Sequence, residues 1–174
     1  LLTNGGQAPV SHNKFADFRI STTDTTRSKT AIEAIDISDF YVQNVGIYDN
    51  WTGNDSIGIY TRGREGVHID GCFIRANIPL KIGHNPYSEI YECDHFSVRD
   101  TTLRTLASGA SSPSKNVYVE DNVVIYNKNF SGQNAWIGGD YGFYWNITSN
   151  PGSISYNLQF TDIRTEQGTN TSGY

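Results

Sequence analysis

The chain has 174 residues, a formal net charge of −5 and only 18% charged residues, with 17 Gly and 11 Tyr. Its 13 Lys and Arg residues are not clustered, which excludes the basic patch of a nucleic-acid-binding protein, and no apolar run reaches the roughly 18 residues of a membrane span. The chain has no Met, and its first four residues lack the regions of a signal peptide. We therefore expect an internal piece of a longer extracellular protein.

A short pattern of apolar residues returns six times along the chain. Each copy reads as a strand with alternating apolar residues, then a turn residue, then a second short strand. The copies, of which the first is the weakest, cover residues 18–22, 40–47, 67–74, 96–103, 117–124 and 158–165. A unit of this size cannot bury its own apolar face, so the repetition predicts a solenoid in which the copies stack on one another.

The spacing of the copies indicates the kind of solenoid. Successive copies begin 22, 27, 29, 21 and 41 residues apart, whereas helical repeats keep a nearly constant period. The apolar spacing of an amphipathic helix is also missing over any long window of the sequence. A coil of strands tolerates uneven spacing because extra residues bulge out at its corners. The widest interval leaves room for a further coil built from Ala135–Ile137 and Phe143–Ile147.

The turn position of the pattern holds residue types that tolerate a positive φ angle. Its occupants are Asn44, Gly71, Asp100, Asp121 and Asp162. The aspartates have two interpretations, a functional carboxylate cluster or a column of corner residues. Because Asn and Gly take the same place in other copies, we favour the column of corner residues.

A third strand follows several copies, and these strands are predicted at Ser56–Tyr60, Pro79–Ile82, Thr102–Leu106 and Ala135–Ile137. Three strands per coil predict a parallel β-helix of triangular section, in which equivalent residues stack about 4.8 Å apart. We expect one inward stack to contain Val42, Ile69, Val98 and Val119. The inward positions predicted for the second and third copies are Phe40, Val42, Val45, Ile47, Ile57, Ile59, Val67, Ile69, Cys72, Ile74, Leu80 and Ile82.

Four segments carry a family resemblance, and they read FYVQNVGIYDN, GVHIDGCFIRANIPLKIG, HFSVRDTTLRT and LQFTDIRTEQG. They resemble coils of the pectin-lyase-like right-handed parallel β-helix superfamily, in particular the bodies of bacteriophage tailspikes and tail fibres. The predicted fold is all-β, a single-stranded right-handed parallel β-helix over residues 15–166. Residues 1–14 lead into this solenoid and residues 167–174 lead out of it.

The resemblance implies a place in the virion tail, a homotrimer that contacts other phage tail proteins, and recognition of a bacterial surface polysaccharide with or without its depolymerisation. It does not fix an activity, since the same shape serves lyases, hydrolases, binders and plain shafts. Polygalacturonase-like hydrolases carry an Asp-Asp pair and a Gly-His-Gly segment, but this chain has no such pair and reads Gly83-His84-Asn85. The Arg-x-Pro-x-x-Arg run of pectate lyases is also missing from the sequence.

Two alternatives to a glycan-recognising tailspike therefore remain open. One is a structural β-helical shaft or baseplate component without a ligand. The other is a secreted bacterial polysaccharide lyase or hydrolase.

The corners of the coils are the expected place for a site, because loops on a rigid scaffold carry function. One corner is expected to gather the insertions Tyr60–Gly66, Gly83–His95 and Ala107–Lys115, together with Gly138–Gly142. Aromatic faces stack on sugar rings while acids and amides bind hydroxyl groups. The residues expected to contact glycan at this corner are His84, Tyr87, Tyr91 and Tyr141. Trp51, on the insertion Tyr48–Asp55 at a different corner, and Trp145 are further candidate contacts.

Glycoside hydrolysis requires two carboxylates about 5–9.5 Å apart, and the candidate acid and base are Glu89 and Asp140. Glu89 lies between two tyrosines, and the glycines around Asp140 would let a ligand approach closely. Packing over a corner or against a neighbouring chain is the alternative role for Trp51 and Trp145. Trp136 lies in a predicted strand, so we expect it in the core.

No cofactor or metal is expected. The four histidines are scattered and show no metal-ligand spacing. Cys72 takes an inward position and Cys93 a corner position. We expect free thiols, because this register keeps the two residues farther apart than the Cα separation of about 7 Å that a disulfide allows.

Overall fold

Strands and turns make up the described part of the chain. This computed structural model describes residues 2–3, 13–21, 30–48, 56–62, 66–83, 92–93, 96–105, 114–120, 124–138, 140–146 and 155–166. Within these ranges there is no helix, and hence none long and apolar enough to cross a membrane. The strands are arranged in three parallel sheets.

Successive strands of the chain belong to different sheets. Sheet I contains β1 (Leu2–Thr3), β4 (Thr30–Ile35), β7 (Ile57–Arg62), β10 (Ile78–Ile82), β14 (Lys115–Val119) and β17 (Tyr141–Trp145). Sheet II contains β2 (Asn13–Ala16), β5 (Phe40–Gln43), β8 (Val67–Asp70), β11 (Glu92–Cys93), β12 (Phe96–Arg99), β15 (Val124–Ser131) and β18 (Ser155–Phe160). Sheet III contains β3 (Arg19–Ser21), β6 (Gly46–Tyr48), β9 (Phe73–Ala76), β13 (Thr102–Thr105), β16 (Asn134–Ile137) and β19 (Ile163–Glu166).

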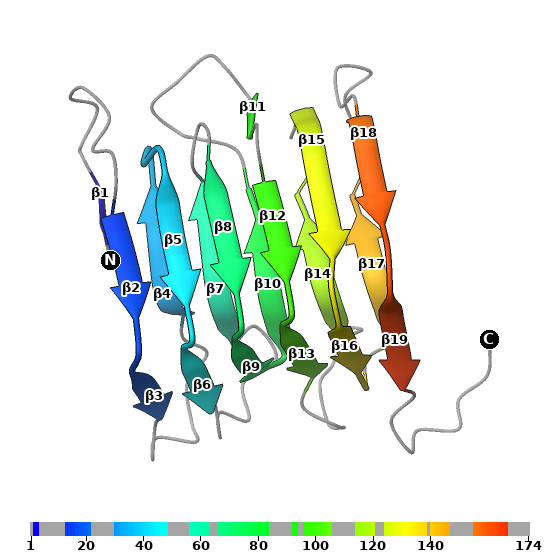
Figure 1. Cartoon of the computed structure of the whole chain (residues 1–174), viewed down its shortest axis with the longest axis horizontal. Coiled ribbons are helices and arrows are strands. Elements are labelled where there is room, and N and C mark those ends of the chain that lie inside the picture. Colours follow the sequence, from blue (N-terminus) through cyan, green and yellow to red (C-terminus); the bar gives the residue numbers. More distant parts are fainter. Residues whose placement is uncertain are drawn as a thin grey trace.

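The chain winds repeatedly from sheet II through sheet III to sheet I. In Figure 1 the strands of sheet II lie in front and point down, those of sheet I lie behind, and the chain advances from left to right. This winding is right-handed, the hand that nearly all parallel crossovers adopt. The prediction of an all-β right-handed parallel β-helix is therefore confirmed.

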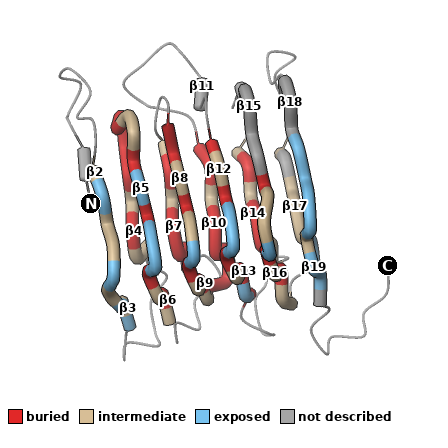
Figure 2. Tube along the Cα trace, in the orientation of Figure 1, coloured by how far each residue is buried: buried red, intermediate tan, exposed pale blue. Residues whose placement is uncertain are grey.

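The core is a stack of inward side chains from successive coils. Val42, Ile69 and Val98 are aligned in the register of β5, β8 and β12, and each is at most 1% exposed. All the inward positions predicted for the second and third copies are buried. Figure 2 shows burial concentrated in the middle strands, while β2 and β3 at the amino-terminal end are more exposed. The end strands are less buried because a coil covers them on one side only.

The corner between sheets II and III is built from residues in the left-handed region. Asn44, Gly71, Asp100 and Asp162 have φ angles of 51°, 61°, 49° and 54°. These residues turn the chain sharply at low steric cost, so the interpretation as corner residues is confirmed for them. Asp121, the fifth predicted corner residue, lies outside the described residues.

Residues 117–119 of the fifth copy of the pattern belong to sheet I and not, as predicted, to sheet II. Val119 belongs to β14 of sheet I and pairs with Ile82, whereas Val98 pairs with Phe130 of β15. The prediction that Val119 continues the inward stack of sheet II is therefore wrong. The strands of all three sheets have the same alternation of inward apolar and outward polar residues. Residues 117–119 therefore fit the pattern of a sheet II strand although they belong to sheet I. The sheet II strand of this coil is β15. It does not fit the apolar pattern because Lys128 stands at the position that pairs with Phe96.

Two of the predicted third strands also belong to a different sheet than expected. Residues 102–105 and 134–137 form β13 and β16 of sheet III, and the sheet I strands of those coils are β14 and β17. The further coil expected in the widest interval is present, since β16 and β17 contain much of the sequence proposed for it.

Trp136 and Cys72 lie where the sequence placed them. Trp136 is 5% exposed and its ring lies edge-on to that of Phe130, with 5.8 Å between centroids. Cys72 is buried and carries a free thiol. That thiol donates to the backbone oxygen of Asp70 at 3.2 Å, and burial raises its pKa. The side chain of Cys93 lies outside the described residues.

Candidate functional site

Three of the predicted site residues belong to the described part of the chain, and all three lie at β17. Asp140 directly precedes this strand, Tyr141 begins it and Trp145 ends it. Trp145 pairs with Val119 in the register, but its side chain is outside the described residues. The other predicted site residues also lie outside them, namely Trp51, His84, Tyr87, Glu89 and Tyr91. The pairing of Glu89 with Asp140 therefore stays a prediction.

The insertions expected at one corner are attached to both edges of sheet I. The segments around 63–65 and 84–91 follow β7 and β10, so they leave the edge where these strands end. The segments around 106–113 and 138–140 precede β14 and β17, so they enter at the edge where the strands begin. The expectation that these insertions share one corner is therefore wrong, because the first two lie between strands of sheets I and II and the last two between strands of sheets III and I. All four connect to strands of sheet I, so we take the outer face of this sheet as the candidate site.

Polar and aromatic side chains alternate with core residues along the strands of this sheet. The register aligns Glu33, Tyr60, Lys81, Tyr118 and Tyr144 in one row across β4, β7, β10, β14 and β17. Their strand neighbours point inward because successive side chains of a strand face opposite sides of the sheet. We call this surface the tyrosine face, and it consists of Glu33, Tyr60, Arg62, Lys81, Tyr118, Glu120 and Tyr144.

Glu120 is the polar centre of the tyrosine face. Its Oε1 accepts a hydrogen bond from the Tyr60 hydroxyl at 2.9 Å and lies 2.6 Å from the Lys81 amine. The side chains of Lys81 and Glu120 are only 17% and 24% exposed. A Cβ at Gly83 would lie 2.4 Å from Glu120 Oε2 and 2.8 Å from the Tyr60 ring. Glycine is therefore needed there for the carboxylate and the ring to come together.

Amines alternate with tyrosine rings along the row. The Lys81 amine lies 4.5 Å from the ring centroid of Tyr60 and 5.5 Å from that of Tyr118. The Lys115 amine lies 4.9 Å from the Tyr118 centroid and 5.0 Å from that of Tyr144. All four distances are within the range of cation–π attraction, so each lysine contacts two tyrosine rings.

The opposite end of the row is fixed by an ion pair between Arg62 and Glu33. The Arg62 guanidinium also lies over the Tyr60 ring, 4.7 Å from its centroid. Burial raises the pKa of Tyr60 well above its ordinary value, and the negative charge of Glu120 raises it further. Tyr60 therefore stays a neutral hydrogen-bond donor across the physiological pH range.

Asp140 and Tyr141 border the tyrosine face in different ways. The Asp140 carboxylate accepts hydrogen bonds from the backbone N–H and the hydroxyl of Ser114, at 2.7 and 3.1 Å. It thus ties together the segments that enter β14 and β17, and its exposed position leaves it open to solvent. Tyr141 is 44% exposed, and its ring centroid lies 5.2 Å from that of Tyr144. Tyr141 therefore extends the row of rings, as a glycan contact would require.

The sequence interpretation missed the central residues of this face. Tyr60 and Lys81 lie in strands that the sequence predicts, but the apolar alternation indicates a role only for their inward neighbours. The available signal was their position in the alternation. Tyr60 lies between inward residues of β7, Lys81 lies between inward residues of β10, and the two are paired in the register. Tyr118 was missed because the fifth copy, which contains it, was predicted in sheet II and lies in sheet I.

The chemistry of the face is that of polar and aromatic contact. Among the described residues no group of three or more His, Cys, Asp or Glu side chains could hold a metal ion. Comparison of the chain with family models, with curated proteins and with solved structures finds no match. We therefore infer function from the side chains of the site.

Proposed function

We propose that the chain is a β-helical segment of a phage tailspike or tail fibre and that its tyrosine face binds a bacterial surface polysaccharide. The observation that carries the proposal is the row of Tyr60, Lys81, Tyr118 and Tyr144, aligned in register across sheet I, with the amines of Lys81 and Lys115 near their rings. The family resemblance of the coils gives the phage context, and the row gives the ligand class.

The row has the chemistry and the shape that a glycan chain needs. The faces of tyrosine rings pack on the apolar faces of sugar rings, and the tyrosine hydroxyls can form hydrogen bonds with sugar hydroxyls. Lys81 and Glu120 supply a charged donor and an acceptor between the rings. The strands repeat about every 4.8 Å, so the face is a long, flat track that suits a polymer rather than a compact small molecule.

A structural shaft without a ligand is the second candidate function. It is favoured by the contacts that Glu120 makes with Tyr60 and Lys81, because these polar side chains are partnered by groups of the protein itself. In that case the tyrosine face would stabilise the solenoid only. The two functions differ in one measurable respect, since a shaft has no affinity for polysaccharide.

Binding and cleavage can be tested together on the full-length protein. Purified capsule and lipopolysaccharide from a panel of bacteria are incubated with it, and bound polysaccharide and newly formed sugar end groups are measured. The proposal expects saturable binding to at least one polysaccharide. If end groups also appear, Glu89→Gln and Asp140→Asn should lower turnover by about 10²–10⁴-fold while binding persists. Absence of binding to every polysaccharide of a panel that includes the host's own would leave the shaft as the function.

We also propose that the full-length protein is a homotrimer. The support is the family resemblance together with an exposed aromatic side chain that a neighbouring chain would cover, namely Phe160, which is 43% exposed. Multi-angle light scattering of the full-length protein should give three times the mass of one chain. A stable monomer in that measurement would contradict the trimer.

A further inference from the structure

The outward side chains of sheet III make a basic surface. Four arginines, Arg19, Arg75, Arg104 and Arg164, lie on β3, β9, β13 and β19 of this sheet. They face outward because they alternate with inward residues of the same strands. None of the described outward side chains of this sheet is acidic, although the chain has a net charge of −5. The surface is separate from the tyrosine face, which belongs to sheet I.

Two of these arginines, Arg75 and Arg104, are direct neighbours. The register pairs them across β9 and β13, which lie side by side in Figure 1. Their Cα atoms are therefore about 4.8 Å apart, and both side chains leave the same face of the sheet. Arg104 is exposed and Arg75 is partly exposed, so a ligand can reach both. Because like charges at neighbouring positions destabilise a sheet, this pair needs a counter-charge.

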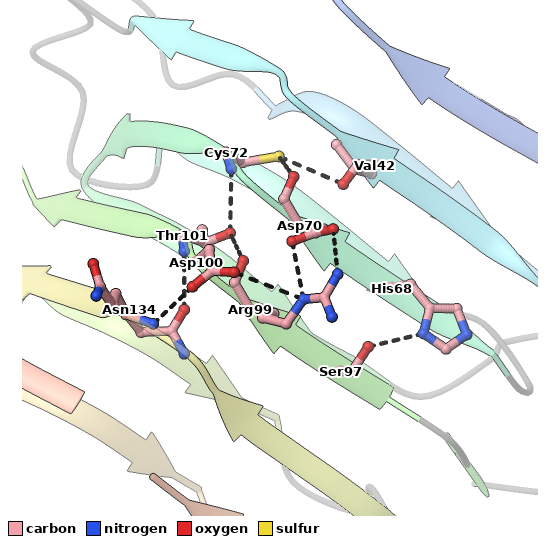
Figure 3. A network of polar contacts seen from close by, with 10 residues as sticks. Val42, His68, Asp70, Cys72, Ser97, Arg99, Asp100, Thr101 and Asn134 are labelled. Carbon is pink, nitrogen blue, oxygen red and sulfur yellow. Dashed lines mark hydrogen bonds and ion pairs between the residues drawn. The ribbon is translucent and has the colours of Figure 1, made fainter. Parts of the chain in front are cut away.

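The described part of the chain does not supply that counter-charge. Neither Arg75 nor Arg104 is paired with a described carboxylate, and the Nε of Arg75 is buried without a hydrogen-bond acceptor there. By contrast, Arg99 on sheet II donates to both carboxylate oxygens of Asp70, at 3.2 and 2.8 Å (Figure 3). A partly buried cation that lacks an acceptor is costly, so an anion bound to the pair would offset this cost.

The strand on the amino-terminal side of the pair leaves room for an anion. The register partner of Arg75 on β6 is Tyr48. The Tyr48 ring leans back over Gly46, where a Cβ would lie 2.6 Å from it. The ring stacks on Phe73 with 5.0 Å between centroids, and the Arg19 guanidinium lies 4.0 Å from its centroid. These contacts hold the ring over the row that precedes Arg75 and keep it from covering this arginine.

The strand on the other side of the pair carries no charge on its outer face. The outward residues of β16 are Ala135 and Ile137, and Ile137 is the register partner of Arg104. Glu166 is on the same row, but β16 lies between its strand and that of Arg104, and its side chain is outside the described residues. The arginine pair is thus bordered by uncharged side chains on both neighbouring strands.

From this arrangement we infer that Arg75 and Arg104 bind a phosphate group, either free phosphate or the phosphate monoester of a small molecule. Two guanidinium groups present planar forks of N–H donors and two positive charges. A phosphate dianion matches that charge and offers three acceptor oxygens, whereas a single carboxylate would leave one positive charge uncompensated. The inference does not depend on the tyrosine face, because the two surfaces share no residue.

The test measures binding of inorganic phosphate and of glycerol phosphate to the full-length protein by titration calorimetry, at a constant ionic strength set with chloride. At least one of the two should bind saturably with a dissociation constant of about 1 mM or lower. Arg75→Gln and Arg104→Gln should each weaken that binding by about tenfold or more. Equal affinities would identify free phosphate as the ligand, and tighter binding of glycerol phosphate would identify the ester. Failure of both anions to bind saturably would overturn the inference.

Two controls separate a built site from general attraction of anions. Arg99→Gln removes the same charge from an arginine that already has a carboxylate partner, so it should leave the phosphate affinity unchanged. A loss as large as that of Arg104→Gln would show that net charge alone attracts the anion, which overturns the site. Acetate, with a single charge, should bind at least about tenfold more weakly than phosphate, and equal binding would overturn the choice of a phosphate group.

Thermal unfolding gives a second readout. Phosphate should raise the unfolding midpoint of the wild type, because a ligand of the folded state stabilises it, but not that of Arg104→Gln. In the absence of phosphate, Arg104→Gln should be no less stable than the wild type, since it removes a like-charged neighbour of Arg75. Arg104 is exposed, so this variant decides if Arg75→Gln folds poorly. A midpoint that phosphate leaves unchanged in the wild type, or raises equally in Arg104→Gln, would overturn the inference.

Discussion

Asn134 accepts a hydrogen bond from the backbone N–H of Thr101 on the preceding coil, with 3.0 Å between N and Oδ1. The amide nitrogen of Asn134 also donates to the backbone oxygens of Val98 and Ser131, at 3.2 and 2.8 Å. One coil earlier, the Thr101 hydroxyl accepts from the backbone N–H of Cys72 at 3.3 Å. A ladder of side chains thus satisfies buried backbone groups inside the turn between sheets II and III, where strand pairing is interrupted.

Removing this amide should destabilise the fold. Asn134 is 1% exposed, so Asn134→Ala leaves the N–H of Thr101 and two carbonyl groups buried without their partner. Each unpaired buried group costs about 1–3 kcal/mol, and we expect a loss of at least that size in the free energy of unfolding, measured by urea denaturation. The control is Gln133→Ala, an exposed neighbour whose backbone N–H alone bonds to Asp100. Equal stability of the two variants would contradict this role.

Truncating the inward stack tests the register of sheet II. Ile69 is 1% exposed and lies between Val42 and Val98 in adjacent strands. Ile69→Ala should cost about 2–5 kcal/mol, because it removes apolar contacts and leaves a cavity, whereas Ile69→Val should cost only about 0.5–1.5 kcal/mol. Thermal or urea unfolding measures both. A cost of Ile69→Ala no larger than that of a surface substitution would mean that the register is shifted by one residue.

Gly71 and Gly132 both lie in the corner between sheets II and III, and alanine variants of the two distinguish the cost of backbone strain from that of a steric clash. Gly71 and Gly132 have φ angles of 61° and 75°. A Cβ at Gly71 would meet only the nitrogen of Asn44, at 3.9 Å, but one at Gly132 would lie 2.5 Å from Asp100 Oδ1. Gly71→Ala should therefore cost about 1–2 kcal/mol for its left-handed backbone, and Gly132→Ala should cost about 1–3 kcal/mol more for overpacking. The same stability loss in both variants would show that the clash at Gly132 is relieved.

The pKa of Tyr60 gives the tyrosine face a pH signature. Burial and the Glu120 carboxylate raise this pKa above the ordinary value of 10.0, so the folded state keeps the proton to higher pH than the unfolded chain does. The associated stability is fully present below the unfolded value and is lost as the pH rises through the folded pKa. The stability of the wild type should therefore fall more steeply in alkaline solution than that of Tyr60→Phe. In a tyrosinate absorbance titration, the last step should vanish in Tyr60→Phe, and its persistence would contradict the assignment.

The fold followed from the sequence wherever the inward positions were apolar and the corner residues were Gly, Asn or Asp. Ile69 and Gly71 are examples, since alternation and a positive φ angle leave one orientation for each of them. The placement failed at Val119, because every sheet of a solenoid uses the same alternation and a sequence pattern does not say which sheet a strand joins. The sheet II strand of that coil, β15, has Lys128 where an apolar residue is expected, so the apolar pattern did not reveal that strand.

The tyrosine face was less predictable than the core. Tyr60, Lys81 and Tyr118 are adjacent only through pairing of strands far apart in the sequence, and an error in one strand moves its outward residues to another face. Glu120 gains its role from Gly83, whose missing side chain admits it. Contacts of this kind depend on the register in three dimensions, which short patterns do not specify. Tyr141, which the sequence analysis proposed as a glycan contact in the segment Gly138–Gly142, has its ring beside that of Tyr144, and its contact with glycan stays a prediction.

Polysaccharide binding by the tyrosine face is tested most directly by measuring the affinity of the full-length protein for its polysaccharide in variants of this face. Tyr118→Ala and Tyr144→Ala should each weaken binding by about tenfold or more. Tyr48→Ala is the matched control, because Tyr48 carries the same kind of contact on sheet III, with Arg19 over its ring at 4.0 Å. The account predicts that calorimetry gives Tyr48→Ala the affinity of the wild type. Unchanged affinity in Tyr118→Ala and Tyr144→Ala, with both variants folded, would contradict it.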